Sequence, residues 1–184
     1  VASINILECL RLLKKEMRFY NAGSSEVFGN TVKPANEETP FKPRSPYATA
    51  KAAAHYAVAN YRESYDMFAC TGILFNHESP LRSNRFVTQK IISTAVRIAC
   101  GSKERLKLGN LAIHRDWGWA PEYVEAMWKL LQHDVPRDII IASGDMHSLE
   151  NFVDKTFSQL GLNSKDHVDL DPLLFRPSDI EFSV

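Results

Sequence analysis

The chain has 184 residues, of which 45% are hydrophobic and 24% are charged, so it has enough apolar material for a folded core. That composition excludes a disordered chain, a collagen-like repeat and a membrane span. Its 22 basic and 22 acidic side chains cancel to zero net charge, so nucleic acid is not an expected partner.

The first half of the chain alternates helical and strand patterns. Residues 3–15 have apolar side chains at helical spacing, and residues 17–22 predict a short buried strand. A polar, proline-rich loop follows over residues 30–46. Ser45 and Pro46 then have helix-start chemistry, with serine as the N-cap and proline at the first helical position.

The second half continues the alternation. Ser148 is predicted to cap a helix that ends at Gly161. Strands that alternate with helices indicate an α/β fold with a parallel sheet covered on both faces. The other predicted elements are a strand at 68–75, a helix at 86–100, a helix at 121–132 and a strand at 138–143.

Charge is unevenly distributed along this second half. Residues 82–115 carry eight basic side chains and one acidic side chain, Glu104, whereas residues 116–184 carry five basic and thirteen acidic ones. A concentrated positive segment can bind an anionic ligand. The alternative is a solvated helix face followed by a basic loop, which needs no ligand. We assign Arg97, Lys103 and Lys107 to solvent.

The cysteines and histidines predict neither disulfides nor a metal site. Cys9, Cys70 and Cys100 are widely spaced and odd in number, which favours reduced thiols, packed as small core residues, in a cytoplasmic protein. His77 and Glu78 lack the second histidine of a zinc motif. We expect Trp117, Trp119 and Trp128 to lie in the core or in the wall of a site.

Tyr47 and Lys51 form a Y-x-x-x-K pattern on the helix that begins at Ser45. The phenol and the ammonium therefore lie one turn apart on the same face, where the ammonium stabilises a phenolate. Such a tyrosine can act as a base. Tyrosine and lysine also occur four residues apart by chance in many helices, so the spacing alone also fits a structural role.

Polar residues follow two of the predicted parallel strands. Ser24, Ser25 and Glu26 come directly after the first strand, and Asn76 and His77 end the next one. Open α/β sheets bind their ligands at this carboxyl edge. Turn chemistry and a surface acid are the alternatives for the serines and the glutamate.

Several longer segments resemble the motifs of one enzyme family. The segments AGSSEVFG, SPYATAK, GILFNHESP, FVTQK and LGNLAIHRDWGWAPEYVEAMW are similar to GDP-mannose 4,6-dehydratases, within the extended short-chain dehydrogenase/reductase family. The resemblance extends over almost the whole chain. It implies a partial doubly wound, Rossmann-like parallel sheet with part of a smaller C-terminal substrate-binding domain.

The resemblance implies a catalytic role for four residues. Tyr47 would take the proton of the sugar 4-hydroxyl while hydride passes to NADP, and Lys51 would hold the nicotinamide ribose and tune Tyr47. Glu26 would remove the C5 proton as the C6 hydroxyl leaves as water, and Ser24 would hydrogen-bond near the sugar 4-oxygen. The hydride then returns to C6, giving GDP-4-dehydro-6-deoxy-D-mannose.

The resemblance also implies binding residues and a domain division. Residues 1–80 would be the C-terminal half of the NADP-binding domain, and 81–184 mostly the nucleotide-sugar region, with 114–145 returning in part to the sheet. Cofactor contacts would come from Tyr47, Lys51, Leu74, Asn76, His77 and Arg82. GDP-mannose contacts would come from Ser25, Asn76, Val87, Lys90, Gly109, Arg115 and Arg176.

Other functions remain open beside this one. A 4-epimerase would need Tyr47 and Lys51 but no elimination, so Glu26 favours a dehydratase. The related dTDP-glucose dehydratases carry Asp-Glu where this chain has Ser25-Glu26.

The family's Gly-rich turn is absent, and the chain opens on Val1. We therefore expect part of a longer cytoplasmic enzyme that forms dimers or tetramers. The alternative is an inactive, truncated product that only binds nucleotide sugar or associates with full-length subunits.

Overall fold

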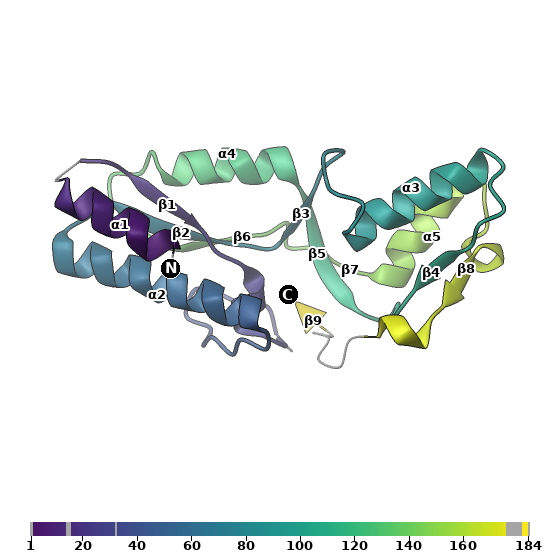
Figure 1. Cartoon of the computed structure of the whole chain (residues 1–184), viewed down its shortest axis with the longest axis horizontal. Helices are drawn as coiled ribbons and strands as arrows, with labels where there is room; N and C mark the ends of the chain where they lie inside the picture. The colour runs from purple at the N-terminus through teal and green to yellow at the C-terminus, as the bar shows by residue number, and fades with distance from the viewer. Residues whose placement is uncertain (1, 14–15, 32, 176–181, 184) are drawn as a thin grey trace.

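The structure is a computed structural model that describes residues 2–13, 16–31, 33–175 and 182–183 (Figure 1). Three parallel strands, β1 (Phe19–Ala22), β2 (Ala69–Leu74) and β6 (Ile139–Ile141), form a sheet in the order β1-β2-β6. All six residues of β2 are buried. A central parallel strand that is covered on both faces has this burial pattern, so the predicted α/β class is confirmed.

Helices cover both faces of this sheet. Helices α1 (Ala2–Leu12) and α2 (Pro46–Tyr65) lie on one face and α4 (Ala120–Leu130) lies on the other (Figure 1). Leu7 and Val58 pack with Ala69 on the first face, and Tyr123 packs against Leu74 on the second.

A second group of elements has its own core. Helices α3 (Val87–Ala99) and α5 (Leu149–Gln159) pack together beside the parallel strands β4 (Leu106–Leu108) and β8 (Val168–Leu170). Ile91 and Phe157 are fully buried there and pack with Leu106. Because few side chains are shared with the three-stranded sheet, each region buries its own apolar residues.

Short strands connect the two regions (Figure 1). Strand β3 (Asn76–Glu78) pairs in parallel with β5 (His114–Trp119), which also pairs antiparallel with β7 (Met146–Ser148) and parallel with β9 (Phe182–Ser183). His77 lies opposite Gly118 in this register. The continuous run from β2 into β3 carries the chain from the first region to the second.

The helix starts predicted from serine residues are confirmed. The Ser45 hydroxyl accepts from the backbone N–H of Ala48, and Pro46 occupies the first turn of α2. The Ser148 hydroxyl accepts from Asn151 N–H at the start of α5. Each cap satisfies an amide that the helix itself leaves unpaired.

The predicted burial of cysteines and tryptophans is partly wrong. Cys70 is buried in β2, but Cys9 and Cys100 are exposed. Trp119, at the end of β5, is 49% exposed. Trp128 is 61% exposed because the buried face of α4 carries Tyr123 and Leu130 instead. Among the described helices, none is both long enough and apolar enough to cross a lipid bilayer.

Candidate active site

The first turns of α2 bring Tyr47 and Lys51 to the carboxyl end of β1. The Lys51 ammonium donates a hydrogen bond of 2.8 Å to the Ala22 carbonyl, the last residue of that strand. The same ammonium lies 5.7 Å from the centroid of the Tyr47 ring. Tyr47 is 52% exposed, so its phenol is accessible at the edge where the strand ends. The predicted proximity of these two groups is present in the structure.

Glu26 lies in a short 3₁₀ turn, Ser25–Phe28, that directly follows β1. The Ser24 hydroxyl caps this turn by accepting from the Glu26 N–H at 3.3 Å. The Ser45 hydroxyl donates to Glu26 Oε2 at 3.4 Å, which links the turn to the start of α2. Ser25 is only 5% exposed, so its side chain is part of the interior.

Ser45 is a site residue that sequence reasoning assigned only to helix capping. Its hydroxyl accepts from Ala48 N–H at 3.0 Å while its proton is directed to Glu26. The two residues are 19 positions apart. The sequence carries only an indirect signal of this contact. Glu26 follows a predicted strand and Ser45 precedes a predicted helix, so both come near the edge of the sheet where ligands bind.

The carboxyl end of β2 carries the predicted cofactor contacts. Leu74 is 8% exposed, and Asn76 and His77 belong to β3, where they pair with Trp117 and Gly118. The Nδ1 atom of His77 lies 2.9 Å from the Phe75 carbonyl. A carbonyl oxygen can only accept, so Nδ1 carries a proton, and in the neutral tautomer with that proton Nε2 is an acceptor.

Arg82 makes two contacts within the protein. Its Nε lies 3.4 Å from Glu78 Oε2, and its guanidinium carbon lies 3.4 Å from the centroid of the Phe86 ring. Glu78 also accepts from the Thr88 hydroxyl at 2.7 Å. The cation is therefore held in one place beside β3, with its charge partly offset by Glu78.

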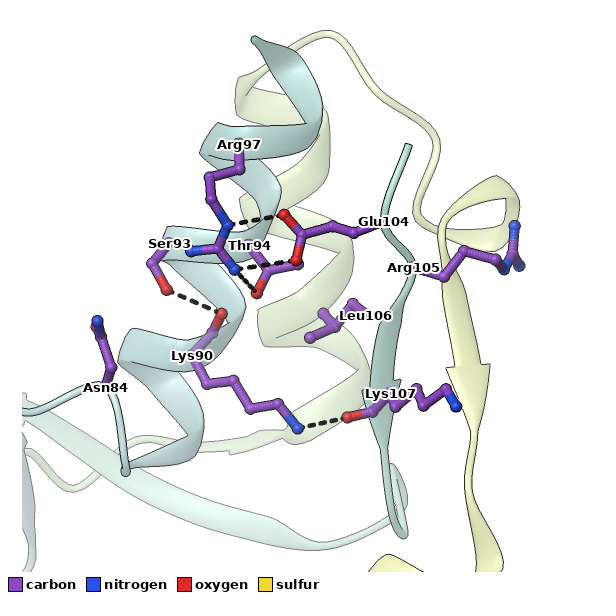
Figure 2. A pocket seen from close by; sticks show the side chains of 9 residues that line it. All are labelled: Asn84, Lys90, Ser93, Thr94, Arg97, Glu104, Arg105, Leu106 and Lys107. Carbon is purple, nitrogen blue, oxygen red and sulfur yellow. Dashed lines mark hydrogen bonds and ion pairs between the residues drawn. The ribbon is translucent and has the colours of Figure 1, made fainter. Parts of the chain in front are cut away.

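Much of the basic segment lines a cavity of about 370 Å³ between α3 and β4 (Figure 2). The Lys90 ammonium donates to the Lys107 carbonyl at 2.6 Å, which ties the helix to the strand. Arg97 binds Glu104 through two hydrogen bonds of 2.7 and 3.1 Å. The lining residues are Asn84, Lys90, Ser93, Thr94, Arg97, Glu104, Arg105, Leu106 and Lys107.

Arg97 is exposed, which agrees with its assignment to solvent, but its guanidinium is also paired with Glu104. Hydrogen bonding to Glu104 holds the pKa of Arg97 above its usual value, and the same bond holds the pKa of Glu104 below its usual value. Lys107 is exposed, as expected. The positive charge of the segment is thus partly neutralised, and the Lys90 side chain reaches from α3 to the backbone of β4 (Figure 2).

The remaining predicted substrate contacts are spread over three elements. Gly109 follows β4, where a Cβ atom would come within 2.7 Å of the Leu174 carbonyl, so packing alone requires glycine there. Arg115 in β5 donates to the His114 carbonyl at 2.8 Å. Val87 begins α3 and packs against the second core. Arg176 lies outside the described residues.

Two adjacent elements, joined by hydrogen bonds, therefore carry Ser24, Glu26, Tyr47 and Lys51. The second region and its connecting strands carry Lys90, Gly109 and Arg115. The model of the GDP-mannose 4,6 dehydratase family matches residues 1–184. This chain belongs to that family.

Individual relatives agree with the family match. The chain is 52% identical over 167 residues to GDP-mannose 4,6 dehydratase 2 of Arabidopsis thaliana, covering 91% of this chain and 45% of the relative. It is 42% identical over 202 residues to the human GDP-mannose 4,6 dehydratase, covering 99% of this chain and 54% of the relative. The chain thus spans about half the length of these curated relatives.

Solved structures show the same fold at low identity. RMD from Pseudomonas aeruginosa, in complex with NADPH, has a TM-score of 0.85 and 22% identity, with 92% of this chain and 58% of that chain covered. The dTDP-glucose 4,6-dehydratase of Bacillus anthracis, in complex with NAD, has a TM-score of 0.83 and 21% identity, with 92% and 54% covered. The predicted Rossmann-like fold is confirmed.

Proposed function

We propose that the chain forms the catalytic edge and part of the nucleotide-sugar site of a GDP-mannose 4,6-dehydratase that uses NADP. The observation that carries this proposal is the gathering of Tyr47, Lys51, Ser24 and Glu26 at the carboxyl end of β1. Family membership supports the reaction class.

The donors at this edge fit a nicotinamide nucleotide. Tyr47 offers a hydroxyl and Lys51 offers an ammonium within the same turn of α2, and both can donate to the hydroxyls of a ribose. When bound, NADP would take a hydride from sugar C4 and later supply it to C6, as C5 regains a proton. NADP rather than NAD is our choice; RMD was solved with NADPH and the dTDP-glucose dehydratase with NAD.

The protein's own residues would move the protons. The Tyr47 phenolate takes the proton of the 4-hydroxyl as that carbon is oxidised, and the Lys51 ammonium stabilises the phenolate. The resulting ketone acidifies the C5 proton, which Glu26 removes while the C6 hydroxyl leaves as water. Ser24 hydrogen-bonds near the 4-oxygen, and Ser45 orients the Glu26 carboxylate through the 3.4 Å contact.

The second region would hold the rest of GDP-mannose. We propose residues 1–80 as part of the cofactor domain and 81–184 as mostly the nucleotide-sugar region, with 114–145 returning in part to the sheet. Cofactor contacts come from Tyr47, Lys51, Leu74, Asn76, His77 and Arg82. Nucleotide-sugar contacts come from Ser25, Asn76, Val87, Lys90, Gly109, Arg115 and Arg176, and the basic ones suit a diphosphate.

Assembly and location complete the proposal. The full-length protein would be a homo-oligomer, a dimer or tetramer, in the cytoplasm. The isolated 184 residues would form no product, because about half the length of the relatives is not covered. Detection of the 4-keto product from this chain alone would overturn that expectation.

The deciding experiment uses the full-length protein with GDP-mannose and NADP. Tyr47→Phe and Glu26→Gln should each lower turnover by about 10² to 10⁴. Absorbance of reduced cofactor separates the two roles: it should rise in a single turnover of Glu26→Gln without product, and stay flat for Tyr47→Phe. Tyr56→Phe, on the same helix and 60% exposed, is the matched control. Unchanged turnover in either site variant would refute the assigned role.

A further inference from the structure

The imidazole of His77 is held on two sides. Its Nδ1 proton is directed to the Phe75 carbonyl at 2.9 Å. The ring lies flat against the ring of Tyr123, with centroids 4.8 Å apart and planes 25° from parallel. These two contacts fix both the plane of the imidazole and the nitrogen that carries its proton.

Tyr123 is itself fixed within the protein. It lies in the first half of α4 and is 3% exposed. Gly118, the partner of His77 in the β3–β5 pair, leaves the space that the ring occupies, since a Cβ there would lie 2.2 Å from Tyr123 Cε2. Any side chain at position 118 would therefore displace the tyrosine from the imidazole.

Asp116 anchors the hydroxyl end of this arrangement. The carboxylate is 3% exposed, and Tyr123 donates to its Oδ1 at 3.5 Å. It also accepts from Ser143 N–H at 3.1 Å, Ser143 Oγ at 2.9 Å and Gly144 N–H at 2.7 Å. One buried carboxylate thus joins β5, α4 and the turn after β6. Burial, with Asp116 beside it, raises the pKa of Tyr123, so the phenol stays protonated and can donate.

We propose that Asp116 and Tyr123 are positioning residues for His77, which they hold so that Nε2 accepts a hydrogen bond from the nicotinamide nucleotide. The inference rests on the proposed function, which assigns His77 to the cofactor. Neither Asp116 nor Tyr123 touches the ligand; each acts through the imidazole. The ligand group that such a nitrogen recognises is a donor, an amide N–H or a ribose hydroxyl.

The test is a double-mutant cycle on the dissociation constant of NADP, measured by calorimetry with the full-length protein. Tyr123→Leu and His77→Ala should each weaken binding about tenfold, and the double variant should be no weaker than His77→Ala alone. Tyr123→Phe and Asp116→Asn, which keep the size of each side chain, should weaken binding about two- to threefold. In the His77→Ala background, neither Tyr123→Phe nor Asp116→Asn should change the dissociation constant of NADP.

Leu130→Ala is the matched control for folding. Leu130 is a buried residue of the same helix, 1% exposed, and belongs to none of the contacts with His77. It should lower the melting temperature and leave NADP affinity unchanged. Additive effects of Tyr123 and His77 variants, or an unchanged affinity in His77→Ala, would overturn the positioning role. Product formation, measured separately, tests the proposed function.

Discussion

The three-stranded sheet and the α3–β4 region hold their polar groups in different ways. At the sheet edge, Lys51 binds a backbone carbonyl of β1 and Ser45 binds Glu26, so neighbouring elements fix the proposed catalytic groups. Around the cavity, long basic side chains reach from a helix surface, and Arg97 is paired with an acid. Proton transfer needs fixed distances between the reacting groups, whereas cations that bind a diphosphate act mainly through their charge.

The largest expected effect contrasts one lysine from each region. Lys51→Met should lower kcat/KM of the full-length protein about 10³-fold, because the ammonium at the Tyr47 ring is lost. Lys90→Met should raise KM for GDP-mannose about tenfold, a loss of about 1.4 kcal/mol, with kcat retained. Steady-state kinetics with varied GDP-mannose measure both. Equal losses of kcat in Lys51→Met and Lys90→Met would contradict the predicted difference between the two regions.

The second prediction concerns how much the core of the α3–β4 region contributes to stability. Phe157 is 0% exposed, so Phe157→Ala should lower the free energy of unfolding by about 3–5 kcal/mol. Urea unfolding followed by circular dichroism measures the loss. Phe175→Ala, at a site 49% exposed, is the control and should change stability by less than about 0.5 kcal/mol. A small loss for Phe157→Ala would mean that its core position has been misassigned.

The third prediction compares two arginine–carboxylate pairs. Arg62 makes a two-point contact with Asp138 at 3.0 and 2.8 Å, with side chains only 20% and 14% exposed. Arg62→Met leaves Asp138 partly buried without its cation, so we expect a loss of about 2–3 kcal/mol. Arg97→Ala breaks an exposed pair and should not shift the melting temperature measurably. Equal shifts by thermal unfolding would contradict the comparison.

The smallest effect is a pH dependence that arises beside the sheet. Burial lowers the pKa of His55, although the nearby Asp138 opposes this. The unfolded chain therefore binds this proton first, near pH 6.5, and stability falls as the pH drops from there through the folded-state pKa. Melting temperatures between pH 7 and 5 should fall less steeply for His55→Asn. His133→Asn, at an exposed position, should keep the original slope.

Sequence reasoning predicted the local features of the site and missed the distant ones. The capping roles of Ser45 and Ser148 were predictable because a cap involves only residues two or three positions away. Exposure of Cys9 and Cys100 was not, because helical periodicity alone does not say how completely a face is covered. Asp116 drew no prediction because its partners Ser143 and Gly144 lie 27 and 28 positions along the chain.

The sequence by itself determined the alternation of strands and helices, the helix starts and the Y-x-x-x-K pair, since each depends on short-range spacing and backbone chemistry. It also determined family membership through long matching segments. Only the tertiary structure decided that Ser45 touches Glu26, that Arg97 is paired with Glu104, and that Tyr123 supports His77. Those contacts join elements far apart in the chain, and packing of the sheet and helices brings them together.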